Sequence, residues 1–381
     1  PGAMFEELGF HYIGPIDGHD LNFLVETLKN LENLKGPKFL HVITTKGKGF
    51  VPAEADPIGY HAISKMPSPE ETNQNKKAKY SDIFGEWACE KASKDKNFIA
   101  ITPAMTEGSG LVNFSKTFPN QFYDVAIAEQ HSMTFAAGLA CAGKKPVLAI
   151  YSTFLQRAYD QLIHDVAIQN LNVLLAIDRA GFVGEDGATH AGIFDLTYLR
   201  CVPNLTIMTP SNEDELWKML NTGYTIDGPV AVRYPRGSGP GEKIENTQEI
   251  LSVGKAKILR EKESNLAILS FGSLLNLADE IADELDCSLI DMRFVKPLDE
   301  DLIAKLAVKH ELLVTLEENM IAGGAGSAVN EFLNKIFAST KILNVGIPDN
   351  FPSIGSPADQ KNEADLEKTK IIEQINKKLN L

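Results

Sequence analysis

The sequence has few cysteines and no long apolar stretch. Its four cysteines, Cys89, Cys141, Cys201 and Cys287, are far apart and form no CxxC pair. This spacing argues against a disulfide framework and against a zinc site, so we expect buried free thiols. No apolar run approaches the roughly 18–20 residues of a membrane helix, and no charged-then-apolar leader opens the chain. We therefore expect a cytoplasmic protein without a membrane partner.

Positive charge is also scarce. Lys and Arg number 37 against 51 Asp and Glu, which gives a formal net charge of −14. An acidic chain does not attract nucleic acid or an anionic membrane surface, so neither is expected as a partner. An anionic substrate would have to be bound by a local cluster of Arg or Lys side chains.

Apolar runs alternate with amphipathic segments almost throughout the sequence. Runs typical of buried strands cover 39–44, 98–102, 146–151, 173–178, 205–208, 230–234, 266–270, 288–294, 312–317 and 342–345. Amphipathic stretches typical of helices cover 20–31, 81–94, 152–170, 213–224, 274–285 and 321–337. Continuous apolar strands separated by helices predict an α/β fold with parallel sheets covered on both faces.

Two polar segments predict linkers. Residues 65–79 are rich in Pro, Lys and Asn, and residues 236–246 are rich in Gly and Pro. They divide the chain into residues 1–78, 79–245 and 246–381. The first piece holds about one βα unit, which is too little to bury a core of its own. We interpret it as the end of a domain whose body lies outside this sequence, followed by two α/β domains.

The segment 124–135 (DVAIAEQHSMTF) contains the first candidate site. Its apolar run 125–128 predicts a strand that delivers Glu129 to the start of a helix, and the segment 151–161 (YSTFLQRAYDQ) adds Phe154 and Arg157. A carboxylate beside an aromatic ring is what a thiamin diphosphate enzyme needs, because a carboxylic acid can hydrogen-bond a pyrimidine nitrogen and activate the ring. Each residue alone has a plainer explanation: an acidic residue in a first helical turn, and a core phenylalanine.

A glycine-rich loop over 178–196 (DRAGFVGEDGATHAGIFDL) follows another predicted strand. It presents Arg179, Asp186 and His190 where open α/β sheets bind ligands. His190 is either a structural histidine or a group that stabilises or protonates a developing oxyanion.

Two arginines end the next predicted strand. Arg233 and Arg236 lie in the segment 230–237 (VAVRYPRG), and Tyr151 could add a hydroxyl at the same edge. Arginine binds phosphate or carboxylate in bidentate geometry, so this edge predicts an anion site; pairing with acidic residues is the alternative. The segments 45–50 (TKGKGF) and 323–327 (GGAGS) match no full phosphate-binding motif, and we interpret them as a flexible loop and as tight helix packing.

Ten blocks, in this order, resemble the 1-deoxy-D-xylulose-5-phosphate synthase family of the transketolase-like thiamin diphosphate superfamily. They are GPIDGHD (14–20), TKGKGF, PAMTEGSG (103–110), DVAIAEQH, YSTFLQRAYDQ, DRAGFVGEDGATHAGIFDL, MTPS (208–211), RYPRG (233–237), DMRFVKPLD (291–299) and EEN (317–319). The resemblance covers nearly the whole chain. It implies the tail of a diphosphate-binding domain, then a parallel-sheet pyrimidine-binding domain and a C-terminal transketolase-like α/β domain.

The resemblance implies a role for each catalytic and cofactor-binding candidate. Glu129 matches the carboxylate that activates the aminopyrimidine ring of thiamin diphosphate, and Phe154 matches the aromatic residue that stacks on that ring. Phe50 matches a cofactor contact from the first domain. His61 matches a histidine close to the thiazolium ring, and His190 matches a residue that assists proton transfer.

The resemblance also implies substrates and partners. Tyr151, Arg179 and Arg236 match the pocket for the acceptor's phosphate, while Arg157 and Asp186 match residues that hold substrate hydroxyls. The implied reaction decarboxylates pyruvate and joins the remaining carbons to D-glyceraldehyde 3-phosphate. Its product, 1-deoxy-D-xylulose 5-phosphate, feeds isoprenoid and thiamin synthesis. A homodimer is implied as well.

The sequence departs from the family in one respect. The family binds Mg²⁺ and diphosphate through a GDG motif in its first domain, and no GDG occurs here. We therefore expect no metal ligand in this chain, and we expect it to be inactive unless its N-terminal fragment is supplied. Three alternatives stay open: a β-like chain of a 2-oxoacid dehydrogenase, a transketolase half, and a non-catalytic dimerising module. The GPIDGHD and TKGKGF blocks, which belong to a first domain, argue against the dehydrogenase chain.

Overall fold

The computed structural model describes residues 2–57, 59–61 and 77–380. The chain divides into two compact units, Pro1–Asn75 (unit 1) and Lys76–Leu381 (unit 2). Most of the linker predicted over 65–79 lies outside the described residues.

Unit 1 is built around a βαβ arrangement. Its elements are α1 (Ala3–Glu7), β1 (His11–Asp17), α2 (Leu21–Glu32), β2 (Lys38–Ile43) and α3 (Val51–Ala55). β1 and β2 pair in parallel, and the Asp20 carboxylate caps α2 by accepting a hydrogen bond from the backbone N–H of Phe23 at 3.0 Å. Phe23 and Leu28 remain about half exposed, so unit 1 buries little apolar surface. The sequence pattern does not indicate β1, because Gly14 and Pro15 interrupt its apolar run.

Unit 2 contains a seven-stranded sheet that carries most of the candidate site. In spatial order its strands are β12 (Phe294–Lys296), β7 (Thr206–Met208), β8 (Val230–Arg233), β6 (Leu174–Asp178), β5 (Lys145–Tyr151), β3 (Phe98–Thr102) and β4 (Phe122–Asp124). All neighbouring strands are parallel except β12, which runs antiparallel to β7 at the edge.

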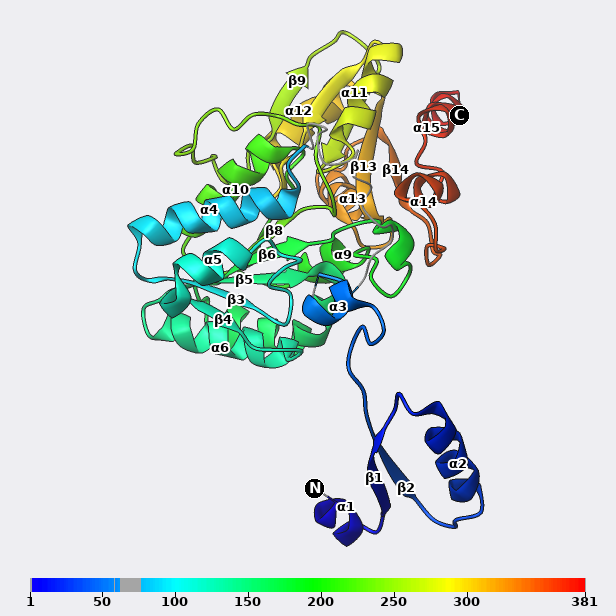
Figure 1. Ribbon diagram of the computed structural model, residues 1–381. Coiled ribbons are helices and arrows are strands. Elements are labelled where there is room, and N and C mark those ends of the chain that lie inside the picture. The colour runs from blue at the N-terminus through cyan, green and yellow to red at the C-terminus, as the bar shows by residue number, and fades with distance from the viewer. Residues whose placement is uncertain (1, 58, 62–76, 381) are drawn as a thin grey trace. The chain divides into compact units, whose positions relative to one another are not determined.

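Helices cover both faces of this sheet, as predicted. On one face, α4 (Tyr80–Lys94) packs beside α10 (Glu213–Thr225), and α5 (Val112–Thr117) lies next to them. Trp87 of α4 donates its indole N–H to the Asn221 side chain of α10 at 3.0 Å. α6 (Glu129–Cys141) covers the opposite face, as Figure 1 shows. The short α9 (Asp195–Leu199) follows the glycine-rich loop.

A second, five-stranded sheet completes unit 2. Its spatial order is β14 (Lys341–Ile347), β13 (Leu312–Met320), β10 (Leu266–Phe271), β11 (Ser288–Asp291) and β9 (Lys257–Arg260), with β9 antiparallel to β11 and the other neighbours parallel. Its helices are α11 (Leu275–Glu284), α12 (Glu300–Lys309), α13 (Ala325–Lys335), α14 (Pro357–Glu363) and α15 (Lys368–Leu379). One apolar cluster contains Ile177 from the first sheet and both Leu269 and Phe332 from the second part, so the two α/β parts share a core.

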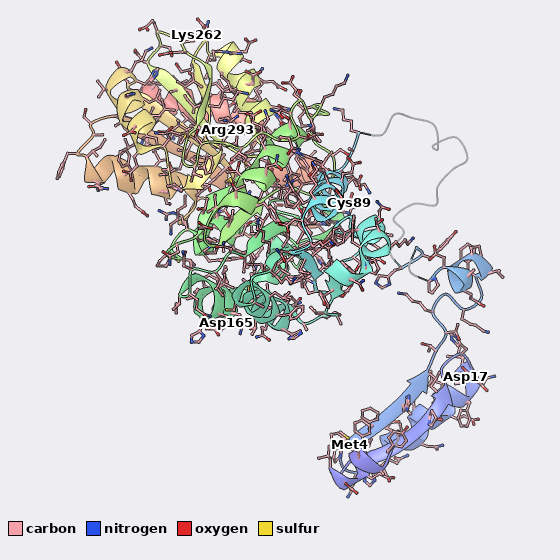
Figure 2. The ribbon with its side chains drawn as sticks, turned by 90° about the vertical axis from the view of Figure 1, so that its left-hand side faces the viewer. Met4, Asp17, Cys89, Asp165, Lys262 and Arg293 are labelled. Atoms are coloured by element: carbon pink, nitrogen blue, oxygen red, sulfur yellow. The ribbon has the colours of Figure 1, made fainter. Side chains whose placement is uncertain are left out.

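The strand predicted over 288–294 is wrong as a single element. β11 ends at Asp291 and β12 begins at Phe294, because the chain turns at Arg293, which has a left-handed backbone with φ of 56°. Arg293 is labelled in Figure 2. After this turn, β12 leaves the second sheet and pairs with β7 of the first.

The helix predicted over 152–170 is also broken. It divides into α7 (Ser152–Leu155), a 3₁₀ turn (Gln156–Ala158), α8 (Tyr159–Gln161) and a π-helical turn (Leu162–Ala167). Such changes of helix type are frequent at functional sites. They alter the direction of the side chains that a regular helix would present: Arg157 lies within the 3₁₀ turn, and Phe154 lies in the α-helical turn directly before it.

The cysteine prediction holds in one respect and is wrong in another. All four thiols are free, but only Cys287 is fully buried; Cys89 is half-buried, and Cys141 and Cys201 are exposed. Within the described ranges, no helix is long and apolar enough to cross a membrane.

Candidate cofactor and substrate site

Glu129 is the first residue of α6, and its side chain is buried with 6% exposed. The strand before it is β4, which ends at Asp124, so the strand predicted over 125–128 is wrong. Those residues form a turn instead, in which Ala126 has a left-handed φ of 59°. One Asp124 carboxylate oxygen holds this turn by accepting hydrogen bonds from the backbone N–H groups of Ala104 at 2.9 Å and Ala126 at 3.0 Å. The turn therefore fixes the start of α6 and, with it, the position of the Glu129 carboxylate.

Arg157 and Phe154 lie beside this carboxylate. Arg157 Nη1 forms an ion pair with Glu129 Oε1, and its guanidinium carbon lies 5.0 Å from the centre of the Phe154 ring. The structure thus brings together three residues that the sequence singled out in two separate segments.

Phe154 belongs to a small aromatic cluster at the end of β5. Its ring stacks on Tyr151, with ring centres 5.5 Å apart and planes 9° apart. The His190 ring meets Phe154 edge-on, with centres 5.6 Å apart, and His190 Nδ1 is 2.9 Å from the Thr189 hydroxyl oxygen. His190 therefore reaches the same site from the glycine-rich loop.

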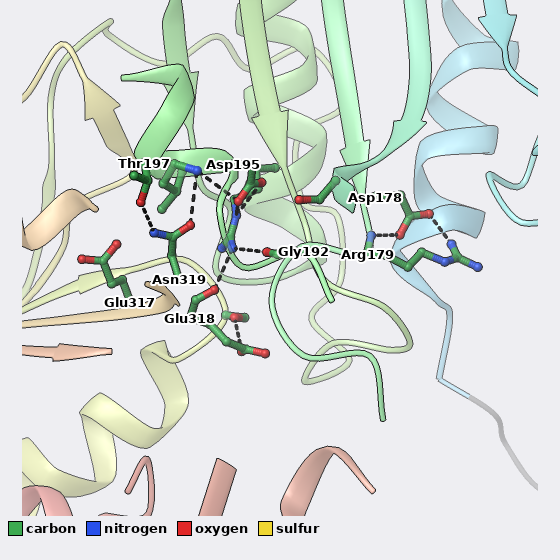
Figure 3. A network of polar contacts seen from close by, with 12 residues as sticks. Asp178, Arg179, Gly192, Asp195, Thr197, Glu317, Glu318 and Asn319 are labelled. Carbon is green, nitrogen blue, oxygen red and sulfur yellow. Dashed lines mark hydrogen bonds and ion pairs between the residues drawn. The ribbon is translucent and has the colours of Figure 1, made fainter. Parts of the chain in front are cut away.

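Arg179 follows the last residue of β6 and faces Tyr151. Its backbone is left-handed with φ of 55°, and its guanidinium carbon lies 4.2 Å from the centre of the Tyr151 ring. Arg179 Nη1 pairs with the Asp178 carboxylate and donates to the Gly108 carbonyl oxygen at 2.6 Å (Figure 3 shows the Asp178–Arg179 pair). Burial raises the pKa of Asp178 to about 6, and the charge of Arg179 opposes this shift. Strained backbone at such a loop is typical of functional sites.

Gly108 lies against the Tyr151 hydroxyl. A Cβ at this position would lie 1.9 Å from Tyr151 Oη, so only glycine fits. Burial also raises the pKa of Tyr151 to about 12, which keeps its hydroxyl protonated and able to donate a hydrogen bond at neutral pH.

Arg236 and Asp186 form a pair at the same edge of the sheet. Arg236 Nη1 lies 3.0 Å from an Asp186 carboxylate oxygen and 3.8 Å from one of Glu185, and it also donates to the Val183 carbonyl. Asp186 raises and Arg236 lowers the pKa of Tyr151 through their charges, so these three groups lie close to one another. The Arg236 side chain keeps 37% of its surface exposed, which leaves part of the guanidinium open to a ligand.

Arg233 is not available to a ligand, so the anion-site hypothesis is wrong for this residue. Its side chain is 3% exposed, and Nε donates to both carboxylate oxygens of Asp195 at 2.9 and 2.8 Å. Its Nη2 donates to the carbonyl oxygens of Gly192 at 3.0 Å and Glu318 at 2.7 Å (Figure 3). Pairing with an acidic residue, the alternative left open by the sequence, is what the structure contains.

Sequence reasoning missed how the EEN block supports the site. The Glu318 carboxylate accepts hydrogen bonds from the Phe182 backbone N–H at 2.9 Å and from the Ser273 hydroxyl at 2.8 Å, so it holds the glycine-rich loop against the second sheet. Asn319 accepts from the Leu196 N–H at 3.3 Å and donates to the Thr197 hydroxyl at 3.1 Å (Figure 3). The available signal in the sequence was that the polar EEN residues come at the end of a long apolar run, which forms β13.

Glu317 explains the GGAGS segment. Its carboxylate accepts hydrogen bonds from the backbone N–H groups of Ala325 and Gly326, each at 2.8 Å, and so fills the N-terminus of α13. Burial raises the pKa of Glu317 to about 7. The segment serves tight packing, as predicted, because a Cβ at Gly324 or Gly326 would lie only 2.3 or 2.5 Å from a neighbouring side-chain oxygen.

Phe50 and His61 belong to unit 1. Phe50 precedes α3 and meets the Tyr60 ring edge-on, with ring centres 5.7 Å apart. His61 Nδ1 contacts the Lys46 ammonium group of the TKGKGF block. The structure therefore gathers these residues within unit 1, and their convergence with Glu129 stays a prediction. Among the described residues, no group of three or more His, Cys, Asp or Glu side chains is arranged to hold a metal ion.

Family models match three successive parts of the chain. The model for the transketolase pyrimidine-binding domain matches residues 76–241, and that for the transketolase C-terminal domain matches residues 254–371. A model described as 1-deoxy-D-xylulose-5-phosphate synthase matches residues 1–44.

Solved structures share the fold. A chain described as a split-gene transketolase, inactive β4 tetramer, has a TM-score of 0.72 at 26% identity, over 80% of this chain and 99% of that chain. Transketolase from Campylobacter jejuni has a TM-score of 0.64 over 99% of this chain and 69% of that chain. At 17% identity, the second likeness shows the fold alone.

Curated relatives are much closer in sequence. The 1-deoxy-D-xylulose-5-phosphate synthase of Hahella chejuensis is 60% identical over 383 residues, and that of Nitrosomonas europaea is 56% identical over 384 residues. Both alignments include 100% of this chain but only 59% and 62% of the relatives' own length. Over its whole length the chain is similar to 1-deoxy-D-xylulose-5-phosphate synthases, its two larger parts match transketolase domain models, and it spans about three fifths of the length of these relatives.

Proposed function

We propose that this chain is part of a thiamin diphosphate-dependent 1-deoxy-D-xylulose-5-phosphate synthase, which condenses pyruvate with D-glyceraldehyde 3-phosphate and releases carbon dioxide. Residues 1–78 would be the end of the diphosphate-binding domain, 79–245 the pyrimidine-binding domain and 246–381 the C-terminal domain. The observation that carries the proposal is the buried Glu129 carboxylate beside Phe154, at the edge where Tyr151 and Arg179 also meet.

These residues fit the pyrimidine half of the cofactor. A buried carboxylate next to an aromatic ring offers a hydrogen-bonding group and a stacking surface, which together suit a polar aromatic heterocycle. When bound, thiamin diphosphate would supply the carbanion chemistry that cleaves the bond next to the pyruvate carbonyl. Mg²⁺ and the diphosphate would be held by the part of the relatives that this chain does not span.

The other site residues would bind and orient the substrates. Tyr151, Arg179 and Arg236 would hold the acceptor's phosphate, because a protonated phenol and two arginines match an oxyanion. Asp186 would accept a hydrogen bond from a substrate hydroxyl. His190, at the edge of Phe154, would move a proton to or from the substrate oxygen.

The remaining roles concern Arg157 in unit 2 and two residues of unit 1. Arg157 would hold a substrate hydroxyl together with Asp186. Phe50 would contact the cofactor, and His61 would assist proton transfer close to it. This part of the proposal requires unit 1 to approach Glu129 in the active enzyme.

We also propose a homodimer and a cytoplasmic location. The homodimer is what the resemblance of the sequence blocks implies. The four free thiols suit a reducing compartment, since disulfides are rare there.

The chain alone should be inactive. The split-gene transketolase chain, whose structure aligns with 80% of this chain, is described as an inactive tetramer. Its description supports the expectation that this chain alone is inactive. The test is turnover of pyruvate plus D-glyceraldehyde 3-phosphate with thiamin diphosphate and Mg²⁺, measured for this chain alone and after adding the N-terminal part of the Hahella chejuensis relative. We expect activity in the mixture only.

Any other outcome of this turnover experiment would favour a different function. Activity of the chain alone would overturn the requirement for the N-terminal part. If both preparations are folded but silent, turnover of ketose phosphates without pyruvate would indicate a transketolase half. Reduction of a lipoyl partner would indicate a dehydrogenase β-like chain, and no activity at all would leave a dimerising module.

A further inference from the structure

Arg157 makes two contacts at once, one with a carboxylate and one with an aromatic ring. Its Nη1 atom pairs with Glu129 Oε1, and its guanidinium carbon lies 5.0 Å from the centre of the Phe154 ring. A guanidinium group is planar and stacks on aromatic rings while donating hydrogen bonds in its own plane. One flat cation therefore contacts both the carboxylate and the ring.

The proposed function gives these same two contacts to the aminopyrimidine ring. That ring would also be flat, would lie against Phe154 and would hydrogen-bond the Glu129 carboxylate. A ring that hydrogen-bonds Oε1 of Glu129 and stacks on the Phe154 face that Arg157 covers would need the place that the guanidinium fills. Arg157 and the cofactor ring therefore compete for one place.

The burial of the two partners indicates which one moves. The Glu129 side chain is only 6% exposed, whereas the Arg157 side chain is 54% exposed. A buried carboxylate without a partner is costly, so Glu129 needs the cation while the cofactor is absent. Arg157 belongs to the 3₁₀ turn, and within the described ranges Glu129 is its only ion-pair partner. Its side chain can therefore turn away from Glu129 toward solvent.

We propose that Arg157 is a placeholder for the aminopyrimidine ring: it neutralises Glu129 and covers Phe154 until the cofactor displaces it. The displaced guanidinium then becomes free to bind a substrate hydroxyl. Cofactor binding and completion of the substrate site are thereby linked through one side chain. This inference rests on the proposed function.

The competing explanation makes the opposite prediction. If Arg157 stays paired with Glu129 when the cofactor binds, it orients the carboxylate and its removal weakens cofactor binding. If Arg157 is a placeholder, its removal strengthens cofactor binding, because the ring no longer has to break an ion pair.

The test is calorimetric titration of thiamin diphosphate with Mg²⁺ into the chain reconstituted with the N-terminal part of its relative. We expect Arg157→Met to lower the dissociation constant by about five- to tenfold, while turnover of pyruvate falls because the substrate contact is lost. Arg157→Lys keeps the positive charge and should bind the cofactor nearly as wild type does. Arg260→Met is the matched control, since Arg260 pairs with Asp279 and Asp283 on the second sheet's side of unit 2.

A second measurement needs no cofactor. Thermal unfolding of the chain alone should show a lower midpoint for Arg157→Met, and Glu129→Gln in the same chain should remove most of that loss, because the buried charge is then gone. If the Met variant does not fold, Arg157→Gln serves in both experiments.

Two outcomes overturn the inference and are distinguishable. Equal or weaker cofactor binding by the folded Arg157→Met protein would refute the placeholder role and leave the proposed function standing. If the reconstituted wild type binds no thiamin diphosphate, the proposed function fails and the inference fails with it.

Discussion

Arg233 donates from Nε to both carboxylate oxygens of Asp195, at 2.9 and 2.8 Å, in a place where neither side chain is more than 3% exposed. Arg233 ends β8, Asp195 begins α9, and the same guanidinium also binds the Glu318 carbonyl on β13. This pair therefore connects the sheet that carries the candidate site with the second sheet. Because it is buried, breaking this pair should cost more stability than breaking an exposed ion pair.

Removing one partner of this pair should strongly destabilise unit 2. Asp195→Asn leaves the Arg233 charge buried without a counter-ion, and breaking a buried pair in this way costs about 3–5 kcal/mol. Urea unfolding measures the loss. Arg260→Met, which removes the more exposed ion pairs with Asp279 and Asp283, should cost less than about 1 kcal/mol. Equal losses for both variants would contradict the distinction.

Asp291 should make stability depend on pH. Burial, together with the negative charge of Glu215, raises the pKa of Asp291 to about 7. An unfolded aspartate has a pKa near 4. The folded state therefore holds a proton that the unfolded state has lost, and this contribution to stability disappears as pH rises from about 4 to about 7.

Asp291→Asn tests this dependence because asparagine does not titrate. Glu317 and Asp178 titrate in the same range, so the comparison is between variant and wild type at each pH. Urea unfolding at pH 5 and pH 8 should show that wild type loses more stability than the variant over this interval. Parallel losses would mean that Asp291 does not carry the effect.

Glu129→Gln should abolish most activity of the reconstituted enzyme. Glutamine has nearly the same shape but cannot transfer a proton, and positioned acid–base groups contribute about 100-fold or more. Steady-state kinetics with pyruvate and D-glyceraldehyde 3-phosphate measure kcat. Glu331→Gln is the matched control, because Glu331 is an exposed carboxylate paired with Arg200. A loss below tenfold would remove Glu129 from its proposed role.

Gly108→Ala should damage the acceptor site more than the donor site. The added Cβ would lie 1.9 Å from Tyr151 Oη, so the tyrosine must move, together with the Arg179 side chain that lies over its ring. We expect the KM for D-glyceraldehyde 3-phosphate to rise about tenfold or more, as for a lost charge-assisted contact, with little change in the KM for pyruvate.

Gly138→Ala provides the control for this change. Gly138 lies within α6, and a Cβ there would meet no atom beyond the adjacent backbone of its own helix within 4 Å, so alanine should leave both KM values unchanged and favour the helix slightly. If Gly108→Ala also leaves both values unchanged, Tyr151 and Arg179 do not bind the acceptor.

Much of the fold could be predicted because its signals are local. The apolar run 98–102 corresponds to β3, and the amphipathic segment 213–224 nearly coincides with α10. The short edge strands β4 and β9 were missed, since β9 is mostly exposed and lacks an apolar run. The break between β11 and β12 was also missed, because it depends on one left-handed residue, Arg293, and on a partner strand in another sheet.

The candidate site shows the same division. Glu129, Phe154, Tyr151, Arg179 and His190 were found from motif blocks, and the structure groups them. Arg233 and Arg236 were indistinguishable in sequence, both being arginines at the end of one strand. Their surroundings separate them: Arg233 is buried and bound to Asp195 and two carbonyls, whereas Arg236 keeps part of its guanidinium exposed.

The sequence by itself determined the alternation of strands and helices, the family resemblance and the residue types available for chemistry, since these follow from periodicity and short motifs. Only the tertiary structure decided that Arg157 covers Phe154 and neutralises Glu129, and that Glu317 fills the end of α13. Such pairings join residues from different segments. They depend on which charges the fold buries and on which partner lies within hydrogen-bonding distance.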